Sequence, residues 1–137
     1  MSRAYIVSTG IITAIGNNTE ENYAALAKGN AGITQAEILQ TSHTFPVGEI
    51  KMSNEELAEK IGANATWPRT ALLSIWAAKE AWQPFASKAE DLRIAFISAN
   101  TVGGMDLTEG FYEAFKEDKH SGNLDDVQYH ECGAITE

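Results

Sequence analysis

The chain has 137 residues, of which 44% are hydrophobic and 21% are charged, proportions typical of one globular domain. Ten Lys and Arg residues against 19 Asp and Glu residues give a formal net charge of -9, which opposes binding to a phosphate backbone or to an anionic bilayer. We therefore expect no nucleic-acid partner and no membrane partner. The single cysteine, Cys132, excludes an internal disulfide and a multi-cysteine metal site, and the N-terminus lacks a secretory signal pattern, so we expect a cytoplasmic protein.

The first 30 residues predict a strand, a turn and a helix. Residues 3–7 form a short β-rich run, and the apolar stretch 11–15 ends at Gly16, which favours a buried strand followed by a tight turn. Thr19 stands where an N-cap hydroxyl is expected, with two acidic residues behind it in the positive first turn of a helix. Gly29 is the predicted end of that helix.

The next segment predicts an edge strand and a short helix. Residues 31–44 show no clear period, and residues 45–50 are typical of a short edge strand because their proline cannot donate to a ladder. Ser53 and Glu56 have the spacing of a capping box, which opens a brief helix that ends at Gly62.

The second half predicts a long helix, a buried strand and another helix. From Pro68 to Pro84, apolar residues recur at spacings of three and four. Residues 92–98 form a continuous apolar run, which predicts a strand in the middle of a sheet, covered on both faces. The loop 100–104 leads to Asp106, which can cap a helix with an acidic residue three positions later. Its inward face is expected to carry Leu107, Phe111 and Phe115. From residue 116 onward the chain is charged and aperiodic, so residues 116–137 are expected to form an exposed connection.

Strands that alternate with long helices indicate the α/β class rather than a helical bundle or a β-sandwich. A sheet of two or three strands would cover these helices poorly. We therefore expect that further strands of the same domain lie beyond Glu137.

Several pieces of the chain, in this order, resemble the opening of a known family. They are the strand and turn at 6–16, the helix at 21–26, the Gly-x-x-Gly-Ile turn at 29–33, the segment 45–50, the Ala-rich helix around 77–81, the strand at 93–98 and the glycine-rich loop at 100–104. Together they resemble the N-terminal part of the β-ketoacyl synthases, condensing enzymes of the thiolase-like superfamily. The resemblance covers about residues 3–115. It departs from the family at the first turn, which is shorter than the commonest form and lacks its second glycine and its proline. This departure favours a divergent subgroup of the family.

The resemblance implies a thiolase-like layered α/β fold, of which this chain is the N-terminal part of the first half. It also implies decarboxylative condensation of an acyl thioester with malonyl-acyl carrier protein, in fatty acid or polyketide-type synthesis, by a homodimer or a ketosynthase heterodimer. Acyl carrier protein is the implied partner, and no metal or diffusible cofactor is implied.

The catalytic groups of that family are expected outside this chain. The family's nucleophilic cysteine lies at the start of a buried helix in a Thr-Ala-Cys type setting, and two histidines follow much later. Cys132 has a different setting and comes too early, so we assign it no catalytic role and expect the isolated chain to be inactive. Two alternatives stay open. The chain could belong to a non-catalytic subunit that shapes the pocket of an active partner, or the natural protein could have only 137 residues, as the product of a degraded gene or of proteolysis.

The sequence therefore predicts no catalytic, cofactor-binding or metal-binding residue in this chain. The loop after the predicted central strand is the candidate neighbour of the pocket. Its candidate residues are Asn100, Thr101, Gly103 and Gly104. The alternative interpretation is an ordinary turn between a strand and a helix.

Three other patterns in the sequence resemble functional sites of different kinds. Thr9 to Gly16 nearly spells the glycine turn of short-chain dehydrogenases, but the middle glycine is missing, the helix is delayed, and no acidic residue follows at the spacing that holds a ribose. His130, Glu131 and Cys132, with His120, could suggest a zinc site or a Cys-His pair, but their spacing favours surface polar residues. The three tryptophans are expected to serve packing rather than ligand stacking; they are Trp67, Trp76 and Trp82.

Overall fold

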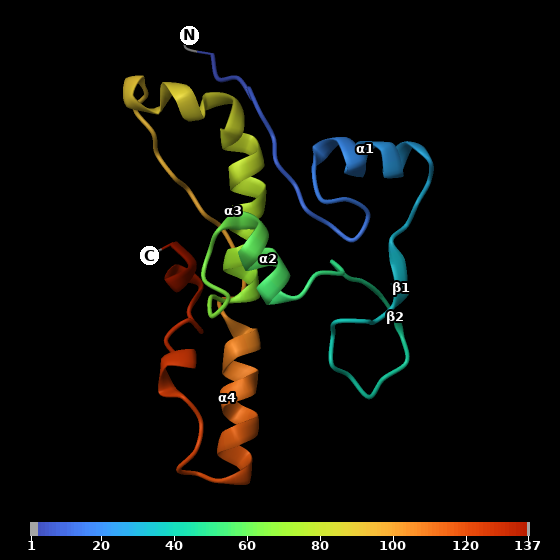
Figure 1. The fold of residues 1–137 in the computed structure, drawn as a ribbon, viewed down its shortest axis with the longest axis vertical. Coiled ribbons are helices and arrows are strands. Elements are labelled where there is room, and N and C mark those ends of the chain that lie inside the picture. The colour runs from blue at the N-terminus through green and yellow to red at the C-terminus, as the bar shows by residue number, and fades with distance from the viewer. Residues whose placement is uncertain (1–2, 137) are drawn as a thin grey trace.

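The structure, a computed structural model, describes residues 3–136 and is a mixture of helices and one small sheet, consistent with the α/β class in its coarse form (Figure 1). The α-helices are α1 (Thr19–Ala27), α2 (Asn54–Ile61), α3 (Arg69–Trp82) and α4 (Met105–Glu117). The strands are β1 (Ile33–Gln35) and β2 (Pro46–Gly48), and the 3-10 helices are η1 (Gln83–Asp91), η2 (Leu124–Asp126) and η3 (Cys132–Thr136). In the described part of the chain, no helix is both long and apolar enough to cross a membrane.

The sheet consists of two short antiparallel strands. Its register pairs Ile33 with Gly48, Thr34 with Val47 and Gln35 with Pro46. The edge strand predicted at 45–50 is confirmed as β2. Its partner β1 was not predicted, because three exposed residues carry no alternation that distinguishes a strand from a loop.

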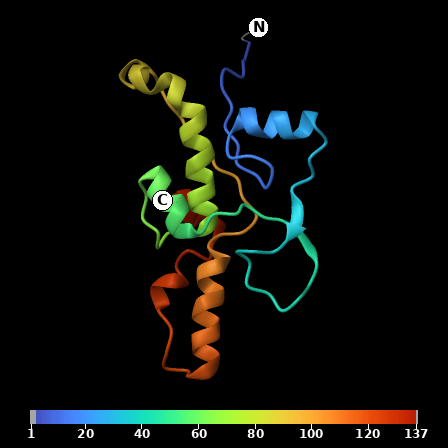
Figure 2. The ribbon, with the colours of Figure 1, turned by 45° about the vertical axis from the view of Figure 1, so that its right-hand side comes forward.

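The prediction of strands at 3–7 and 92–98 is wrong, because neither segment forms a strand in the described residues. Both segments run extended along α3 and join no sheet in the described residues (Figures 1 and 2). Ile6 and Ile97 are each 89% exposed, so the expected burial on both faces is also absent. The apolar pattern is that of a strand, but strand structure requires a neighbour to accept and donate the backbone hydrogen bonds.

Helix α3 is the element around which the described residues pack. The core lies between α2 and α3, where Leu57 and Leu72 are fully buried beside Ala58 and Ile61. The predicted capping box opens α2: the Ser53 side chain accepts from Glu56 N, and the Glu56 carboxylate accepts from Ser53 N. The predicted stop at Gly62 is confirmed, because this residue adopts the left-handed conformation with φ 64°.

The N-terminal segment lies against a second face of α3. Gly10 touches the helix backbone so closely that an added Cβ would lie 2.8 Å from Ala81 N and closer still to Ala77 O. The Glu80 carboxylate accepts hydrogen bonds from Ile11 N at 2.9 Å and from Thr19 N at 2.7 Å. These contacts tie the start of the chain and the start of α1 to one residue of α3.

The turn and cap before α1 differ slightly from the prediction. The tight turn is confirmed as a bridge between Thr13 and Gly16. The N-cap is Asn18 rather than Thr19, because the Asn18 side chain accepts from Glu21 N at 2.8 Å. Asn22, 5% exposed, supports the turn from within by donating to Gly16 O at 2.8 Å.

The predicted cap of α4 has a different role in the structure. Gly104 is the N-cap of α4, and Asp106 lies in the first turn, where it accepts a hydrogen bond from Arg69 N at 2.9 Å. Arg69 is the first residue of α3, whose N-cap, Pro68, makes no side-chain cap hydrogen bond. Asp106 therefore satisfies one of the unpaired N–H groups at the start of the neighbouring helix.

The chain after α4 turns back along it (Figures 1 and 2). Gly122 lies against Phe111, whose ring is stacked on Phe115 with centroids 5.9 Å apart. No residue of α4 is fully buried, so the apolar face expected to point inward is only partly covered. The sequence predicts an exposed connection from residue 116 onward. In the structure this segment is mostly exposed, but it also contains η2 and η3.

Candidate functional site

The predicted loop at 100–104 lies between α3, α4 and the end of the described chain. The Asn100 side chain donates to Cys132 O at 3.1 Å, and Gly104 N donates to Tyr129 O at 2.5 Å. Gly103 and Gly104 are buried, whereas Thr101 is exposed. The returning segment thus covers the glycine end of the loop, whereas Thr101 faces solvent.

Glycine is required in this loop by close backbone approach. A Cβ added at Gly103 would lie 2.5 Å from Tyr129 O and 2.6 Å from Glu131 O, and one added at Gly104 would lie 2.9 Å from the Pro68 ring. Such distances are far shorter than van der Waals contact. In the described residues the two glycines therefore act as packing positions.

One polar atom of this loop is buried without a partner in the described structure, the Oδ1 atom of Asn100. Its amide nitrogen is used for the bond to Cys132 O. A buried acceptor that lacks a donor costs about 1–3 kcal/mol. This oxygen is therefore able to accept a hydrogen bond from a further donor.

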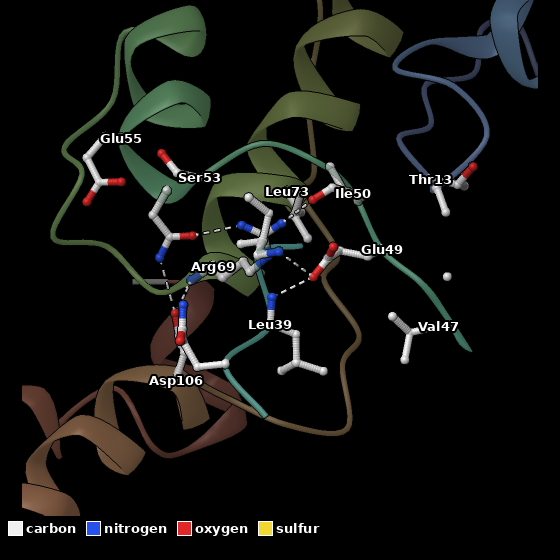
Figure 3. Close-up of a pocket in the computed structure, with 15 residues that line it drawn as sticks. Thr13, Leu39, Val47, Glu49, Ile50, Ser53, Glu55, Arg69, Leu73 and Asp106 are labelled. Atoms are coloured by element: carbon white, nitrogen blue, oxygen red, sulfur yellow. Dashed lines mark hydrogen bonds between the residues drawn. The ribbon is translucent and has the colours of Figure 1, made fainter. Parts of the chain in front are cut away.

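A cavity of about 720 Å³ lies at the starts of α2, α3 and α4 (Figure 3). Its walls come from the turn at 13–14, the loop at 38–40, the segment 47–50, the first turn of α2 and the first residues of α3 and α4. Its volume is within the range of about 300–1,000 Å³ that small-molecule sites occupy. Sequence reasoning did not find it, because its walls are distributed over the first 106 residues.

The cationic group at this cavity is already paired within the protein. The Arg69 guanidinium donates to Ile50 O at 2.8 Å, to Met52 O at 2.9 Å and to Asn54 Oδ1 at 3.0 Å. These bonds, drawn in part in Figure 3, hold the segment before α2 against the start of α3. Arg69 thus has a structural role here.

Glu49 is the second charged group in the cavity wall. Its carboxylate accepts hydrogen bonds from Glu37 N at 2.7 Å, Ile38 N at 3.0 Å and Leu39 N at 2.5 Å. The bond from the backbone of Glu37, followed by that of Leu39, lowers the pKa of Glu49 below its ordinary value of 4.5, and Lys51 adds a weaker effect in the same direction. The carboxylate is therefore ionised at neutral pH. No local motif signals this contact, because the acceptor lies 10 to 12 residues from its donors.

No protein-family model, curated protein or solved structure matches this chain. Its function must therefore be argued from its own residues.

The dehydrogenase alternative meets a specific obstacle at the turn before α1. A dinucleotide pyrophosphate would sit at the helix N-terminus, against the first backbone N–H groups. In this structure the Glu80 carboxylate occupies that position and accepts from Thr19 N. Burial raises the pKa of Glu80, but the bonds from Thr19 and Ile11 together outweigh it, so the pKa is lowered overall. A charged carboxylate at this helix start repels a phosphate.

The remaining candidate groups do not converge. In the described residues, no group of three or more His, Cys, Asp or Glu side chains is placed to hold a metal ion. Cys132 is exposed, and the His130 ring lies 3.3 Å from the Thr108 hydroxyl. Of the tryptophans, Trp76 donates to Asn17 O at 2.7 Å and packs beside the core, and Trp82 lies against Phe85 with ring centroids 6.3 Å apart.

Proposed function

We propose that this chain is the N-terminal part of a β-ketoacyl synthase-like condensing enzyme of thiolase-like layered fold, and that its residues supply scaffold rather than catalytic groups. The complete enzyme would condense an acyl thioester with malonyl-acyl carrier protein in the cytoplasm, as a homodimer or a ketosynthase heterodimer. The proposal rests on the order of motifs in the sequence and on one structural observation.

That observation is the extended, unpaired backbone and the solvent exposure of the segments 3–7 and 92–98. Both have the apolar, β-branched composition of buried strands, yet both run extended and exposed beside α3. Exposed, unpaired apolar strands are unfavourable and are normally covered or paired in a finished protein. The simplest physical reason for two such segments in one chain is that strands from outside these residues complete the sheet.

The packing of the second segment supports this interpretation. A small, mainly apolar cavity of about 250 Å³ separates α3 from Phe96 and Ser98, so one side of the segment already faces a helix. Side chains alternate along an extended segment, so Ile97, 89% exposed, lies on the other side, and that side is open. An extended segment with a helix on one face and free edges fits a layered α/β architecture that lacks its neighbouring strands.

The position of the loop at 100–104 also supports the proposal. It follows an extended segment, where the resemblance implies a strand, and it leads into α4. The unpartnered Asn100 oxygen lies in the same loop. We therefore assign this loop to the surroundings of the pocket rather than to the chemistry.

The proposal is tested on the natural protein and on this chain in parallel. Peptides sequenced from the protein in its source cells should continue past Glu137 and include a cysteine in a Thr-Ala-Cys type setting, which an acyl-thioester-like thiol reagent should label. The isolated chain should show no turnover of acyl and malonyl thioesters. Condensation by the isolated chain would refute the scaffold role.

The same labelling experiment separates the non-catalytic alternative. A longer protein without a cysteine at that position, which copurifies with a labelled partner, would be the pocket-shaping subunit of a heterodimer. A natural protein that ends at Glu137 would remove the enzymatic proposal altogether.

A further inference from the structure

The ten-residue loop 36–45, which connects β1 to β2, is held in place by very few bonds. The strands at its base pair over three residues each, and a pairing that short is only marginally stable. In the described part of the chain, the hydrogen bonds that tie the loop to residues outside this pair run to Glu49 and Lys51. The loop thus depends on two side chains that follow it in the sequence.

Those two side chains are unequal. The Lys51 ammonium forms an ion pair with Glu37 in which both side chains are solvent-exposed, and exposed pairs of this kind contribute little. The Glu49 carboxylate instead gathers three consecutive backbone N–H groups, an arrangement that binds anions strongly. Most of the attachment of the loop therefore comes from one negative charge.

The same loop forms part of the wall of the 720 Å³ cavity. Ile38, Leu39 and Gln40 line it from the loop, directly beside the amides that Glu49 binds. Figure 3 shows Leu39 joined to Glu49 at the cavity, which Leu73 of α3 also lines. Movement of the loop would therefore remove one side of the cavity.

We propose that the 36–45 loop is a movable wall of this partly open cavity, hereafter the lid, and that the Glu49 carboxylate is the latch that keeps the lid docked. Release requires loss of the negative charge or displacement of the carboxylate from the three amides by another anion. The hydrogen bonds that lower the pKa of Glu49 keep the latch ionised, and the lid docked, at neutral pH. Among the described residues, Lys51 also lowers the pKa of Glu49 and forms an ion pair with Glu37 of the lid, so it favours the same docked position.

The test measures access to the α3 wall of the cavity. In a background with Cys132→Ser, the substitution Leu73→Cys places a single thiol in that wall, and its labelling by an uncharged maleimide is timed at neutral pH. Glu49→Gln keeps the size of the side chain but removes its charge. The matched control is Glu55→Gln, a cavity-lining carboxylate that makes no hydrogen bond to the loop.

Glu49→Gln should speed labelling about ten-fold or more, the factor expected when hydrogen bonds to a charged group are weakened, and Glu55→Gln should leave it within about two-fold. Hydrogen exchange on the same samples should rise in residues 36–45 and stay unchanged in α2 and α3. Unchanged labelling in Glu49→Gln would overturn the proposal. An equal rise in Glu55→Gln, or faster exchange throughout α2 and α3, would also overturn it, because the carboxylate would then support the fold rather than the lid.

Discussion

Replacement of Asp106 tests the most unexpected contact in the structure, the capping of one helix by the first turn of another. The Asp106 carboxylate accepts from Arg69 N at 2.9 Å, at the start of α3, while it lies in the positive first turn of α4. Asp106→Ala should therefore remove two contributions. Loss of a helix cap costs about 0.5–2 kcal/mol, and loss of the favourable charge at a helix N-terminus costs about 0.3–1 kcal/mol.

The expected decrease in the free energy of unfolding is their sum, about 1–3 kcal/mol for Asp106→Ala. Asp106→Asn keeps an acceptor oxygen for Arg69 N and loses only the charge, so its cost should be about 0.3–1 kcal/mol. Urea unfolding followed by far-ultraviolet circular dichroism gives both values, provided that the slope with urea stays constant.

Glu109→Ala is the matched control, because Glu109 is an exposed acid on the same helix beyond its first turn. Its effect should stay within about 0.5 kcal/mol. If Asp106→Ala changed stability no more than this control, the cross-helix cap would contribute nothing. If Asp106→Asn were as harmful as Asp106→Ala, the charge rather than the hydrogen bond to Arg69 would be responsible.

Three further predictions concern the packing around α3. Leu57→Ala and Leu72→Ala, both at fully buried positions, should each lower the free energy of unfolding by about 2–5 kcal/mol in the same urea assay. Gly10→Ala would force a methyl group to 2.8 Å from Ala81 N, against helix backbone that cannot rotate away, and should cost about 1–3 kcal/mol. Because the pKa of Glu80 is lowered in the folded state, its contribution is present above the ordinary value of 4.5 and is lost as the pH falls through the lowered value, so the urea midpoint should drop in acid.

Each of these three predictions has a control substitution in the same protein. Leu26→Ala, at an exposed position of α1, should have little effect beside the two core substitutions. Gly110→Ala, where an added methyl group meets nothing within 4 Å, should stabilise α4 by about 0.5–1 kcal/mol, the reverse of the result at Gly10. Glu80→Gln should flatten the loss of stability in acid; an unchanged pH profile would remove Glu80 as its source.

Local features of the chain were predictable because their causes are local. The capping box at Ser53, the glycine stop at Gly62 and the apolar spacing of α3 depend on residues within a turn or two of one another. The tight turn before α1 and the edge strand β2 were found for the same reason. The helix predicted after the loop at 100–104 is confirmed as α4, but the strand predicted before the loop is an unpaired extended segment.

The errors came from interactions that join distant residues. An apolar run such as 92–98 has the composition of a strand, but whether it pairs depends on neighbours that the run itself does not contain. Asp106 stands three residues before an acidic residue, as a capping residue would, yet it accepts its hydrogen bond from Arg69, 37 residues away. A side chain near two helix starts can cap either one, and only their relative position selects between them.

The sequence by itself determined the helices α1 to α4, the cap and stop of α2 and the coarse α/β character, because backbone hydrogen bonding and side-chain period act over a few residues. Only the tertiary structure decided that Glu80 anchors the N-terminal segment and that Glu49 binds the loop beside the cavity. Each of these carboxylates is separated from its donors by 10 or more residues of chain. Such contacts form when packing brings charged and polar groups together, since a buried or partly buried backbone N–H must find an acceptor wherever the fold supplies one.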